Sequence, residues 1–407
     1  MTIVHPIARA WLTTGGPAGQ TTAAQNYDEF ADDAEITAII SANPSSALAV
    51  EMPHRAPESV GRPFADCLPD AVARLATAKE QGRYAAADDV VVLYRITGPD
   101  GTRGYGLWTM VETAQISTSA DEPGLVIRNE DVFIEKVRER VALAKATEHL
   151  LSPVLLLQTA GGDDLHTALA SAVAEAGEPA ARDTDPAGRI HEIWPVGPGD
   201  TRDRLLALAG GGELVVADGN HRSLAAQIAD LPRFLAVVTT PASVAIQPYN
   251  RLVAELSLTP AELVARLTAV GATVTALTGT PAVPAQGGTV HLYTAAGAWA
   301  VTLPAAGSAQ VVDDLDHALV ERYLFGDVLG LDPGDKRITY VGGDYPADWL
   351  RAEVDAGRAE LAVLIAPVTV DDFVAVNLAR LKMPRKSTWF TPKARAGLVV
   401  ADLTAES

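Results

Sequence analysis

The sequence predicts an α/β fold with mixed sheets, on two observations. Short apolar runs alternate with Ala-rich amphipathic segments through the 407 residues, a pattern typical of α/β proteins. Hydrophobic residues make up 48% of the chain and charged residues 20%, which is an ordinary globular composition. A chain of this length is expected to divide into two regions, residues 1–245 and 246–407.

The first region is expected to alternate helices and strands. A Gly-Pro-Asp-Gly sequence at residues 98–101 predicts a hairpin, because Pro and Gly supply the backbone angles of a tight turn. The clearest helix is expected over residues 131–151, since Phe133, Val137 and Val141 share one face. The other expected helices cover residues 36–42, 71–80 and 202–208, and strands cover residues 47–52, 90–97, 103–112, 154–158, 191–196, 213–217 and 234–239.

The second region is expected to be α/β as well. Thr259 and Pro260 begin a helix, with a capping Thr followed by Pro at the first helical position. Residues 281–288 are the best candidate for an exposed loop. Strands are expected over residues 273–277, 290–294, 298–303, 338–341 and 361–367, and helices over residues 314–324 and 371–381.

Charge and cysteine content exclude several classes of protein. The net charge of −19 argues against nonspecific nucleic-acid binding, which needs basic surface. The single cysteine, Cys67, allows no intramolecular disulfide. The first residues lack the features of a signal peptide, and no apolar run is long enough to cross a bilayer. We therefore expect a cytoplasmic protein without a membrane or nucleic-acid partner.

The most informative segment is Asp218-Gly219-Asn220-His221-Arg222, between a short strand and an Ala-rich helix. Helix starts attract anions, and an adjacent Arg binds phosphate through two hydrogen bonds. Asp218 can bind Mg²⁺ or orient a hydroxyl, while His221 and Arg222 can contact phosphate. The alternative is that Asp218 caps the helix and Arg222 forms a surface ion pair.

Two other segments are candidates for chemistry. Residues 127–131 place Glu130 at a helix start, whose field keeps a carboxylate ionised for use as a base; plain helix capping is an equal alternative. Residues 382–395 hold the densest basic cluster of the chain, where Lys386, Ser387, Thr388 and Lys393 suit a polyphosphate and an aromatic residue can stack on a base. In the alternative, the aromatic residues only anchor this segment to the core.

Three weaker signals receive structural interpretations. Residues 15–22 are Gly- and Thr-rich but lack the Lys of a phosphate loop, so they are interpreted as a flexible loop. His191-Glu192 lacks the second His of a zinc helix. Residues 27–29 are polar, and the sequence leaves open whether they enter a site or form a plain loop.

With these segments identified, the chain resembles the DUF 1015 family of unknown function. Its members carry Asp-Gly-His-His-Arg after a strand, matched here by residues 218–222, and a His-Glu pair before a long helix with a Lys/Asp-Arg element, matched by Asn129-Glu130 and Glu139-Arg140. A Pro-x-x-Arg segment is matched by residues 248–251, ending at Arg251. The final Met-Pro-x-Lys-Ser-Thr-x-Phe-x-Pro-Lys motif is matched by residues 383–393.

This family is similar to the ParB/sulfiredoxin fold group, which includes kinases of free L-serine. The resemblance implies a ParB/sulfiredoxin-like core in residues 1–245 and an additional C-terminal α/β region that shares the active site. Two departures stand out, since Asn220 and Asn129 replace family His residues. Asn cannot titrate, so any proton-carrying role of those His residues is lost here or has moved to His221 or His191.

The leading hypothesis is therefore a kinase that uses ATP or ADP with Mg²⁺ to phosphorylate free L-serine or a similar hydroxy amino acid. Glu130, Asp218 and His221 are the expected catalytic residues, with Asp218 also as the metal ligand. The expected nucleotide-binding residues are Gly219, Asn220, Arg222, Arg251, Lys386, Ser387, Thr388 and Lys393. The alternatives are a non-catalytic nucleotide-binding regulator and a nucleotide hydrolase or tailoring enzyme, and a homodimer is left open.

Overall fold

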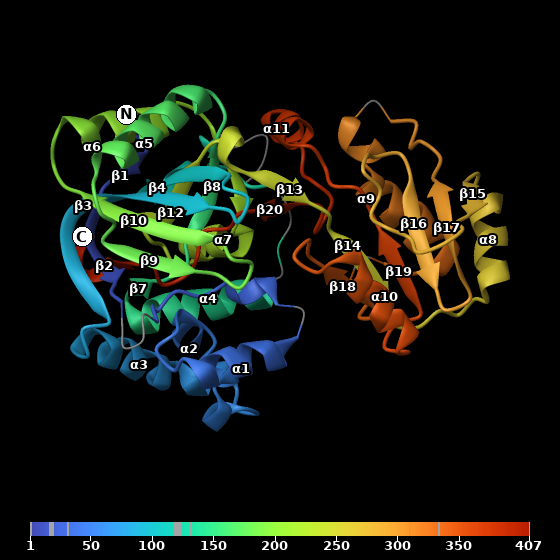
Figure 1. Cartoon of the computed structure of the whole chain (residues 1–407), viewed down its shortest axis with the longest axis horizontal. Helices are drawn as coiled ribbons and strands as arrows, with labels where there is room; N and C mark the ends of the chain where they lie inside the picture. The colour runs from blue at the N-terminus through green and yellow to red at the C-terminus, as the bar shows by residue number, and fades with distance from the viewer. Residues whose placement is uncertain are drawn as a thin grey trace. The chain divides into compact units, whose positions relative to one another are not determined.

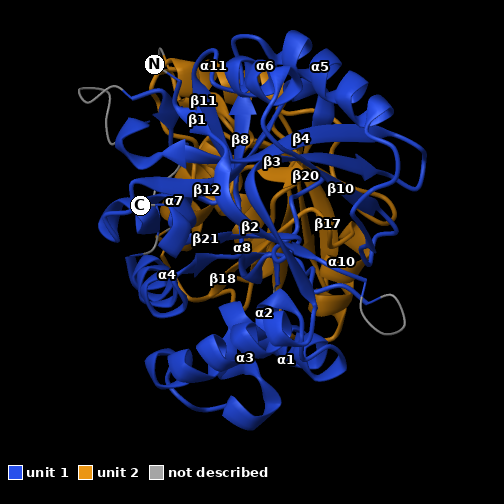
Figure 2. Cartoon of the chain, turned by 90° about the vertical axis from the view of Figure 1, so that its left-hand side faces the viewer, with its two compact units in different colours: residues 1–244, 392–407 blue, residues 245–391 orange. Residues whose placement is uncertain are grey.

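The α/β prediction is confirmed by a computed structural model, which describes residues 2–15, 20–30, 32–117, 124–129, 132, 134–308, 310–332 and 334–406. The chain forms two compact units, residues 1–244 with 392–407 and residues 245–391 (Figure 2). The sequence placed every residue after 245 in one region, whereas residues 392–407 return to the first unit. A ParB-like core stays a prediction.

A mixed sheet forms the centre of unit 1 (Figure 1). Within the described residues it has thirteen strands, and its main order is β5-β6-β11-β8-β12-β4-β3-β2-β21-β7. Off this path, β1 pairs with β4, and β10 pairs with β3 and β9. The strands are β1 (Val4–His5), β2 (Ile7–Thr13), β3 (Tyr84–Thr97), β4 (Arg103–Glu112), β5 (Ile116–Ser117), β6 (Val126–Ile127), β7 (His149–Leu150), β8 (Val154–Gln158), β9 (Ala181–Thr184), β10 (Ile190–Val196), β11 (Leu214–Asp218), β12 (Arg233–Thr239) and β21 (Val399–Asp402).

Helices cover both faces of this sheet (Figure 1). On one face, α5 and α6 bury Leu165, Leu169 and Leu205 against the strands. On the other face, a second core joins α1, α2 and α3 to the Leu143 side chain of α4. The helices of unit 1 are α1 (Asp33–Ala42), α2 (Ala47–Glu51), α3 (Leu68–Glu80), α4 (Ile134–Thr147), α5 (Gly162–Glu175), α6 (Asp200–Ala209) and α7 (Asn220–Ile228).

Two predicted elements of unit 1 differ from the structure. Residues 47–51 are helical rather than extended, because Ser46 caps the segment by accepting a hydrogen bond from the Leu48 N–H at 3.3 Å. All five residues of this helix are buried, so the sequence has no alternation of polar and apolar residues that separates helix from strand. Helix α4 ends at Thr147, since Glu148 has φ 54° and the chain then enters β7.

Unit 2 has a six-stranded sheet in the order β15-β17-β16-β19-β14-β18 and a separate β13-β20 pair, among the residues that are described. The predicted Thr259 cap of α8 is confirmed, with Glu262 completing a capping box. The strands are β13 (Ala245–Gln247), β14 (Asn250–Val253), β15 (Thr273–Ala276), β16 (Val290–Thr294), β17 (Gly297–Thr302), β18 (Ile338–Val341), β19 (Leu361–Leu364) and β20 (Trp389–Thr391). The helices are α8 (Pro260–Ala269), α9 (Asp316–Leu319), which continues as a π-helix over Val320–Leu329, α10 (Ala347–Asp355) and α11 (Val370–Leu378).

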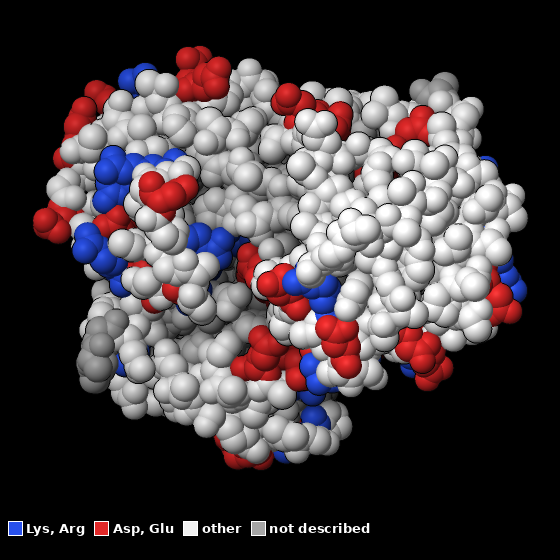
Figure 3. Space-filling model, turned by 45° about the vertical axis from the view of Figure 1, so that its right-hand side comes forward, with Lys and Arg blue, Asp and Glu red and all other residues white. Residues whose placement is uncertain are grey.

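The surface reflects the composition of the chain. On the face in Figure 3, acidic side chains are spread among small groups of Lys and Arg, in keeping with 51 acidic and 32 basic residues. None of the helices in the described part of the chain is long and apolar enough to span a membrane.

Candidate functional site

The Asp218 turn is shaped by a glycine. Strand β11 pairs irregularly with β8 just before Asp218, and Gly219 then takes a left-handed backbone with φ 101°. A Cβ on Gly219 lies 3.2 Å from the guanidinium carbon of Arg222 and 3.2 Å from the Val154 Cα. Only glycine therefore allows helix α7 to start at Asn220 with Arg222 folded back over the turn.

Replacing Gly219 with Ala is expected to destabilise unit 1 by about 1–3 kcal/mol, because the side chain adds both backbone strain and crowding. Urea unfolding monitored by circular dichroism measures the change. Gly177→Ala is the matched control, since Gly177 also has positive φ, at 73°, but a Cβ there meets no atom within 4 Å. Equal losses in the two variants would contradict a special role for the close approach at Gly219.

Two cations hold the Asp218 carboxylate. Arg222 Nη2 donates to its Oδ2 at 2.6 Å, and Lys393 Nζ donates to its Oδ1 at 3.0 Å. Arg222 also donates through Nη1 to the Pro153 carbonyl and, at 3.3 Å, to the Asn26 Oδ1. Arg222 is buried rather than on the surface, and Gly219, without a side-chain cap, occupies the N-cap position. The capping alternative for Asp218 is therefore wrong.

The local charges set the ionisation of this site. Burial alone raises the pKa of Asp218, but the positive charges of Lys393 and Arg222 outweigh it and hold that pKa below its ordinary value. Burial raises the pKa of Glu29, and the Lys393 charge opposes this effect. The Asp218 carboxylate thus stays charged, while proton uptake is easier at Glu29.

The polar turn at residues 26–29 belongs to this site. Asn26 donates from its side chain to Glu29 Oε1 at 2.7 Å and to the Ala394 carbonyl at 3.1 Å, and its own oxygen accepts from Arg222. Tyr27 and Glu29 are buried. The sequence alone did not decide whether these residues enter a site or form a plain loop. Their contacts with Ala394 and Arg222, which are far away in the sequence, place them in the site.

The two Asn residues that replace family His residues contact each other. Asn220 Nδ2 donates to Asn129 Oδ1 at 2.5 Å, and the Asn129 backbone N–H donates to Asn220 Oδ1 at 3.3 Å. Both are buried, so an amide pair fixes the segment before Glu130 to the first turn of α7. Glu130 itself lies outside the described residues. His221 is buried in the same first turn of α7.

The other predicted nucleotide-binding residues lie in unit 2. Arg251 is fully buried and donates to the carbonyls of Tyr249, Asn250 and Arg385, at 2.9, 3.2 and 3.2 Å. Its guanidinium lies 4.4 Å from the Tyr340 ring centre. Arg251 therefore fixes the backbone at Arg385, directly before the predicted phosphate-binding residues, and direct nucleotide binding by Arg251 stays a prediction.

The basic segment, residues 382–395, includes an unusual backbone conformation. Lys386 has φ 53°, which is rare for a residue with a side chain, and its Nζ lies 5.7 Å from the Tyr249 ring centre. Ser387 is fully buried, and its hydroxyl has no hydrogen-bond partner within the described residues. Thr388 is half-buried. Phosphate binding by Lys386, Ser387 and Thr388 stays a prediction.

The aromatic residues of this segment pack into unit 2. Trp389 contacts Tyr249 edge-on at 5.4 Å, and Phe390 contacts Phe373 at 4.8 Å. Both are at most 3% exposed, so their rings are not available to stack on a nucleotide base. The aromatic residues act as anchors, as the structural alternative expected.

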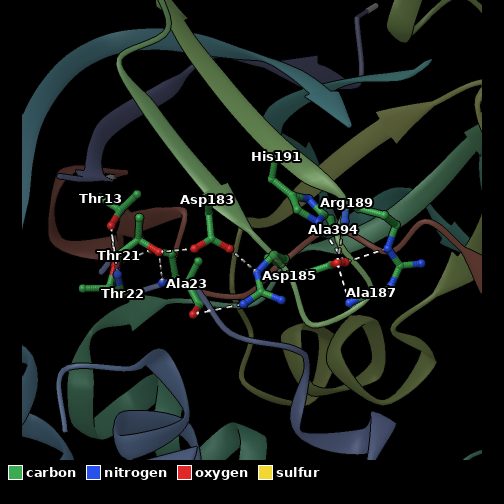
Figure 4. Close-up of polar contacts among 12 residues, drawn as sticks. Thr13, Thr21, Thr22, Ala23, Asp183, Asp185, Ala187, Arg189, His191 and Ala394 are labelled. Carbon is green, nitrogen blue, oxygen red and sulfur yellow. Dashed lines mark hydrogen bonds and ion pairs between the residues drawn. The ribbon is translucent and has the colours of Figure 1, made fainter. Parts of the chain in front are cut away.

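His191 takes part in a separate buried network (Figure 4). Its Nε2 lies 3.2 Å from Asp185 Oδ2, and its Nδ1 lies 2.6 Å from the Tyr94 hydroxyl. Burial lowers the pKa of His191 despite Asp185. Alongside it, Asp183 joins Thr21 to Arg395 (Figure 4). Through Asp185, His191 thus stabilises the turn between β9 and β10.

The donor groups of the site bear on whether it can hold a metal. Among the described residues, no three His, Cys, Asp or Glu side chains are arranged to hold a metal ion. Both oxygens of Asp218 already accept from cations. Mg²⁺ usually binds through one or two carboxylates plus substrate phosphates, and a role of Asp218 as its ligand stays a prediction.

Comparison with protein families gives a clear result. Residues 13–318 match the family described as "Protein of unknown function (DUF1015)". This chain belongs to the DUF1015 family. The match spans well over half of the chain and confirms the resemblance based on the sequence motifs. Comparison with curated proteins found no significant match.

Three solved structures are similar to this DUF1015 protein at low identity. A mutant free serine kinase in complex with AMP has a TM-score of 0.42 and 12% identity, over 73% of this chain and 92% of that chain. SbnI with a C-terminal truncation, from Staphylococcus aureus, has a TM-score of 0.41 and 12% identity, over 73% and 88%. A conserved hypothetical protein from Pyrococcus furiosus has a TM-score of 0.39 and 13% identity, over 72% and 95%.

Proposed function

We propose that this protein is a small-molecule kinase that transfers a phosphoryl group from ATP or ADP to the hydroxyl of free L-serine or a similar hydroxy amino acid. The observation that carries the proposal is the 3.0 Å contact of Lys393 with Asp218. It brings the end of the C-terminal motif to the start of helix α7, a position that favours phosphate. Phosphoryl transfer depends mainly on positioning and charge neutralisation.

Each residue of the site has a role in this reaction. The substrate hydroxyl oxygen attacks the terminal phosphorus, and the bond from phosphorus to the bridging oxygen breaks, so that its electron pair leaves with the nucleotide. Glu130 accepts the hydroxyl proton. Arg222 and Lys393 neutralise phosphate charge, His221 donates to a phosphoryl oxygen, and Asp218 keeps both cations in place. Asp218 would also hold Mg²⁺, which would neutralise further phosphate charge.

The proposal is tested by incubating the protein with ATP or ADP, Mg²⁺ and a panel of hydroxy amino acids, and following products by phosphorus NMR. Lys393→Met is expected to lower kcat/KM by on the order of 10²–10³-fold, because one preorganised cation is lost. Arg202→Met is the matched control. Arg202 is also a mostly buried, ion-paired cation of unit 1, but it lies on α6. No phosphorylated product from folded wild-type protein across the panel would overturn the proposal.

A second candidate is a non-catalytic nucleotide-binding regulator, and the Asn129–Asn220 pair favours it. Two amides stand where the family has two titratable rings, so proton transfer at this position is lost. Calorimetry with nucleotide separates the candidates. Tight binding without amino acid turnover supports the regulator, whereas product formation that depends on Lys393 supports the kinase.

A further inference from the structure

A small cavity of about 50 Å³ lies within unit 1, next to the Asp218 turn. Arg222 lines this cavity and also binds Asp218, so the two are connected through one side chain. Four further polar side chains line it, those of Glu51, Arg140, His149 and Ser152. The rest of the wall is mainly aliphatic and includes Leu143, Leu151, Ala225 and Leu235.

The guanidinium groups at this cavity are short of acceptors. Arg140 is 6% exposed, and its Nη2 donates to the Glu51 carbonyl at 3.0 Å. Its guanidinium carbon lies 4.2 Å from the Tyr27 ring centre. Within the described part of the chain, Nε and Nη1 of Arg140 and Nε of Arg222 are buried without a hydrogen-bond partner. Buried charged donors are costly in this state.

The carboxylate at this cavity is short of donors. Glu51 is 4% exposed, and its Oε2 has no hydrogen-bond partner among the described residues. Burial raises the pKa of Glu51, and the Arg140 charge and the Ser152 hydroxyl only partly oppose this. Two guanidinium groups, each with N–H donors that lack an acceptor, therefore share a mainly aliphatic cavity with a carboxylate oxygen that lacks a donor.

One class of small molecule satisfies all of these groups together. A carboxylate supplies acceptors for the guanidinium N–H donors that lack them, an ammonium group fits the Glu51 oxygen, and an aliphatic carbon skeleton fits the walls. We propose that this cavity binds the amino acid acceptor, with its α-carboxylate on Arg140 and its α-ammonium on Glu51. This inference rests on the proposed kinase function and names the substrate class as a free, zwitterionic α-amino acid.

Glu51→Gln is expected to raise the melting temperature of the ligand-free protein at pH 8 and to change it little at pH 4. The sign follows from the raised pKa. A carboxyl group with a raised pKa in the folded state stabilises the fold below its ordinary value of about 4.5, and this stability is lost as the pH rises through the folded value. Glutamine carries no charge at either pH, so the variant does not lose stability in this way. Differential scanning calorimetry at the two pH values measures it, and a lower melting temperature of the variant at pH 8 would contradict a strained, unpaired carboxylate.

The inference is tested by calorimetric titration of the full chain with L-serine, without nucleotide. Wild-type protein is expected to bind, and to bind L-serinamide, which lacks the carboxylate, and glycerate, which lacks the ammonium, at least tenfold more weakly. Arg140→Met and Glu51→Gln are each expected to weaken L-serine binding at least tenfold. Arg74→Met is the matched control, because Arg74 also donates to a carbonyl of α2, that of Ala49, at 2.8 Å, but does not line the cavity.

Ala225→Leu keeps the inference testable if the charge variants do not fold, because it fills the cavity without removing a charge. It is expected to abolish L-serine binding and to leave nucleotide binding unchanged. Turnover with an unchanged KM for L-serine in all cavity variants would overturn the cavity assignment and leave the kinase function standing. Binding that the variants abolish, without turnover, would overturn the kinase function alone. No binding by wild-type protein would show that the cavity holds only water.

Discussion

Replacing Asp218 with Asn is expected to destabilise unit 1 by about 3–5 kcal/mol and to abolish phosphoryl transfer. The loss of stability arises because Arg222 and Lys393 remain largely buried without their shared anion. The lowered pKa of Asp218 means that it stabilises the fold above its ordinary value of 3.8, and this contribution is lost as the pH falls through the lowered value. Between pH 5 and 8, urea unfolding should show that the free energy of unfolding of the variant is lower than that of the wild type by a constant amount.

The control for Asp218→Asn is Asp185→Asn. Asp185 is also buried and contacts two basic side chains, Arg189 at 2.6 Å and His191 at 3.2 Å. Asp185→Asn is expected to lose a comparable amount of stability, whereas the molecules that remain folded are expected to keep full activity. The double variant Asp218→Asn with Lys393→Met should regain part of the stability, because one uncompensated cation is removed. Full activity in folded Asp218→Asn would contradict the proposed site.

Replacing Arg251 with Met is expected to destabilise unit 2 by about 3–5 kcal/mol and to weaken nucleotide binding at least tenfold. The carbonyls of Tyr249, Asn250 and Arg385 each lose the Arg251 donor, although the His317 ring nitrogen still lies 3.3 Å from the Tyr249 carbonyl. A buried group left unsatisfied costs about 1–3 kcal/mol. The Arg385 carbonyl is one of them, so the basic segment loses its fixed conformation. Hydrogen exchange in β14 and β20 measures the local loss, since a chain of two units need not unfold in one step.

The control for Arg251→Met is Arg337→Met, which removes a partly exposed ion pair of unit 2 with Asp335 and is expected to cost at most about 1 kcal/mol. Arg251→Lys distinguishes positioning from charge, because Lys keeps the positive charge but cannot bridge several carbonyls. Normal nucleotide binding by Arg251→Lys would argue that Arg251 contributes only charge. A loss equal to that of the Met variant supports its role in positioning Arg385.

The sequence predicts what depends on local patterns. The Asp218-Gly219 turn, the Thr259 cap and the hairpin at residues 98–101 are each encoded within a few neighbouring residues, and the structure has them. The strand expected at residues 47–52 is wrong for a local reason as well, since a short apolar run does not distinguish a buried strand from a buried helix. The capping residue Ser46 was the one sequence signal that favoured a helix here.

The rest of the candidate site depends on contacts between distant residues. Asn26, Arg222 and Ala394 meet through hydrogen bonds that span more than 190 positions, and no periodicity in the sequence reports such a contact. The sequence placed Glu51 in an expected strand and Arg140 in a family motif, and the contact of Arg140 with the Glu51 carbonyl required the fold. The C-terminal motif identified Lys393 in the sequence, but its contact with Asp218 is apparent only from the fold.

Strand β21 has a consequence for how this protein is made. It lies between β2 and β7 in the sheet of unit 1, although it comes from residues 399–402. A ribosome therefore completes unit 2 before it has synthesised the strand that unit 1 needs. Until β21 is synthesised, β2 stays unpaired on that side, an edge open to pairing with other chains. Chaperone demand during synthesis should therefore fall on the first half of the protein.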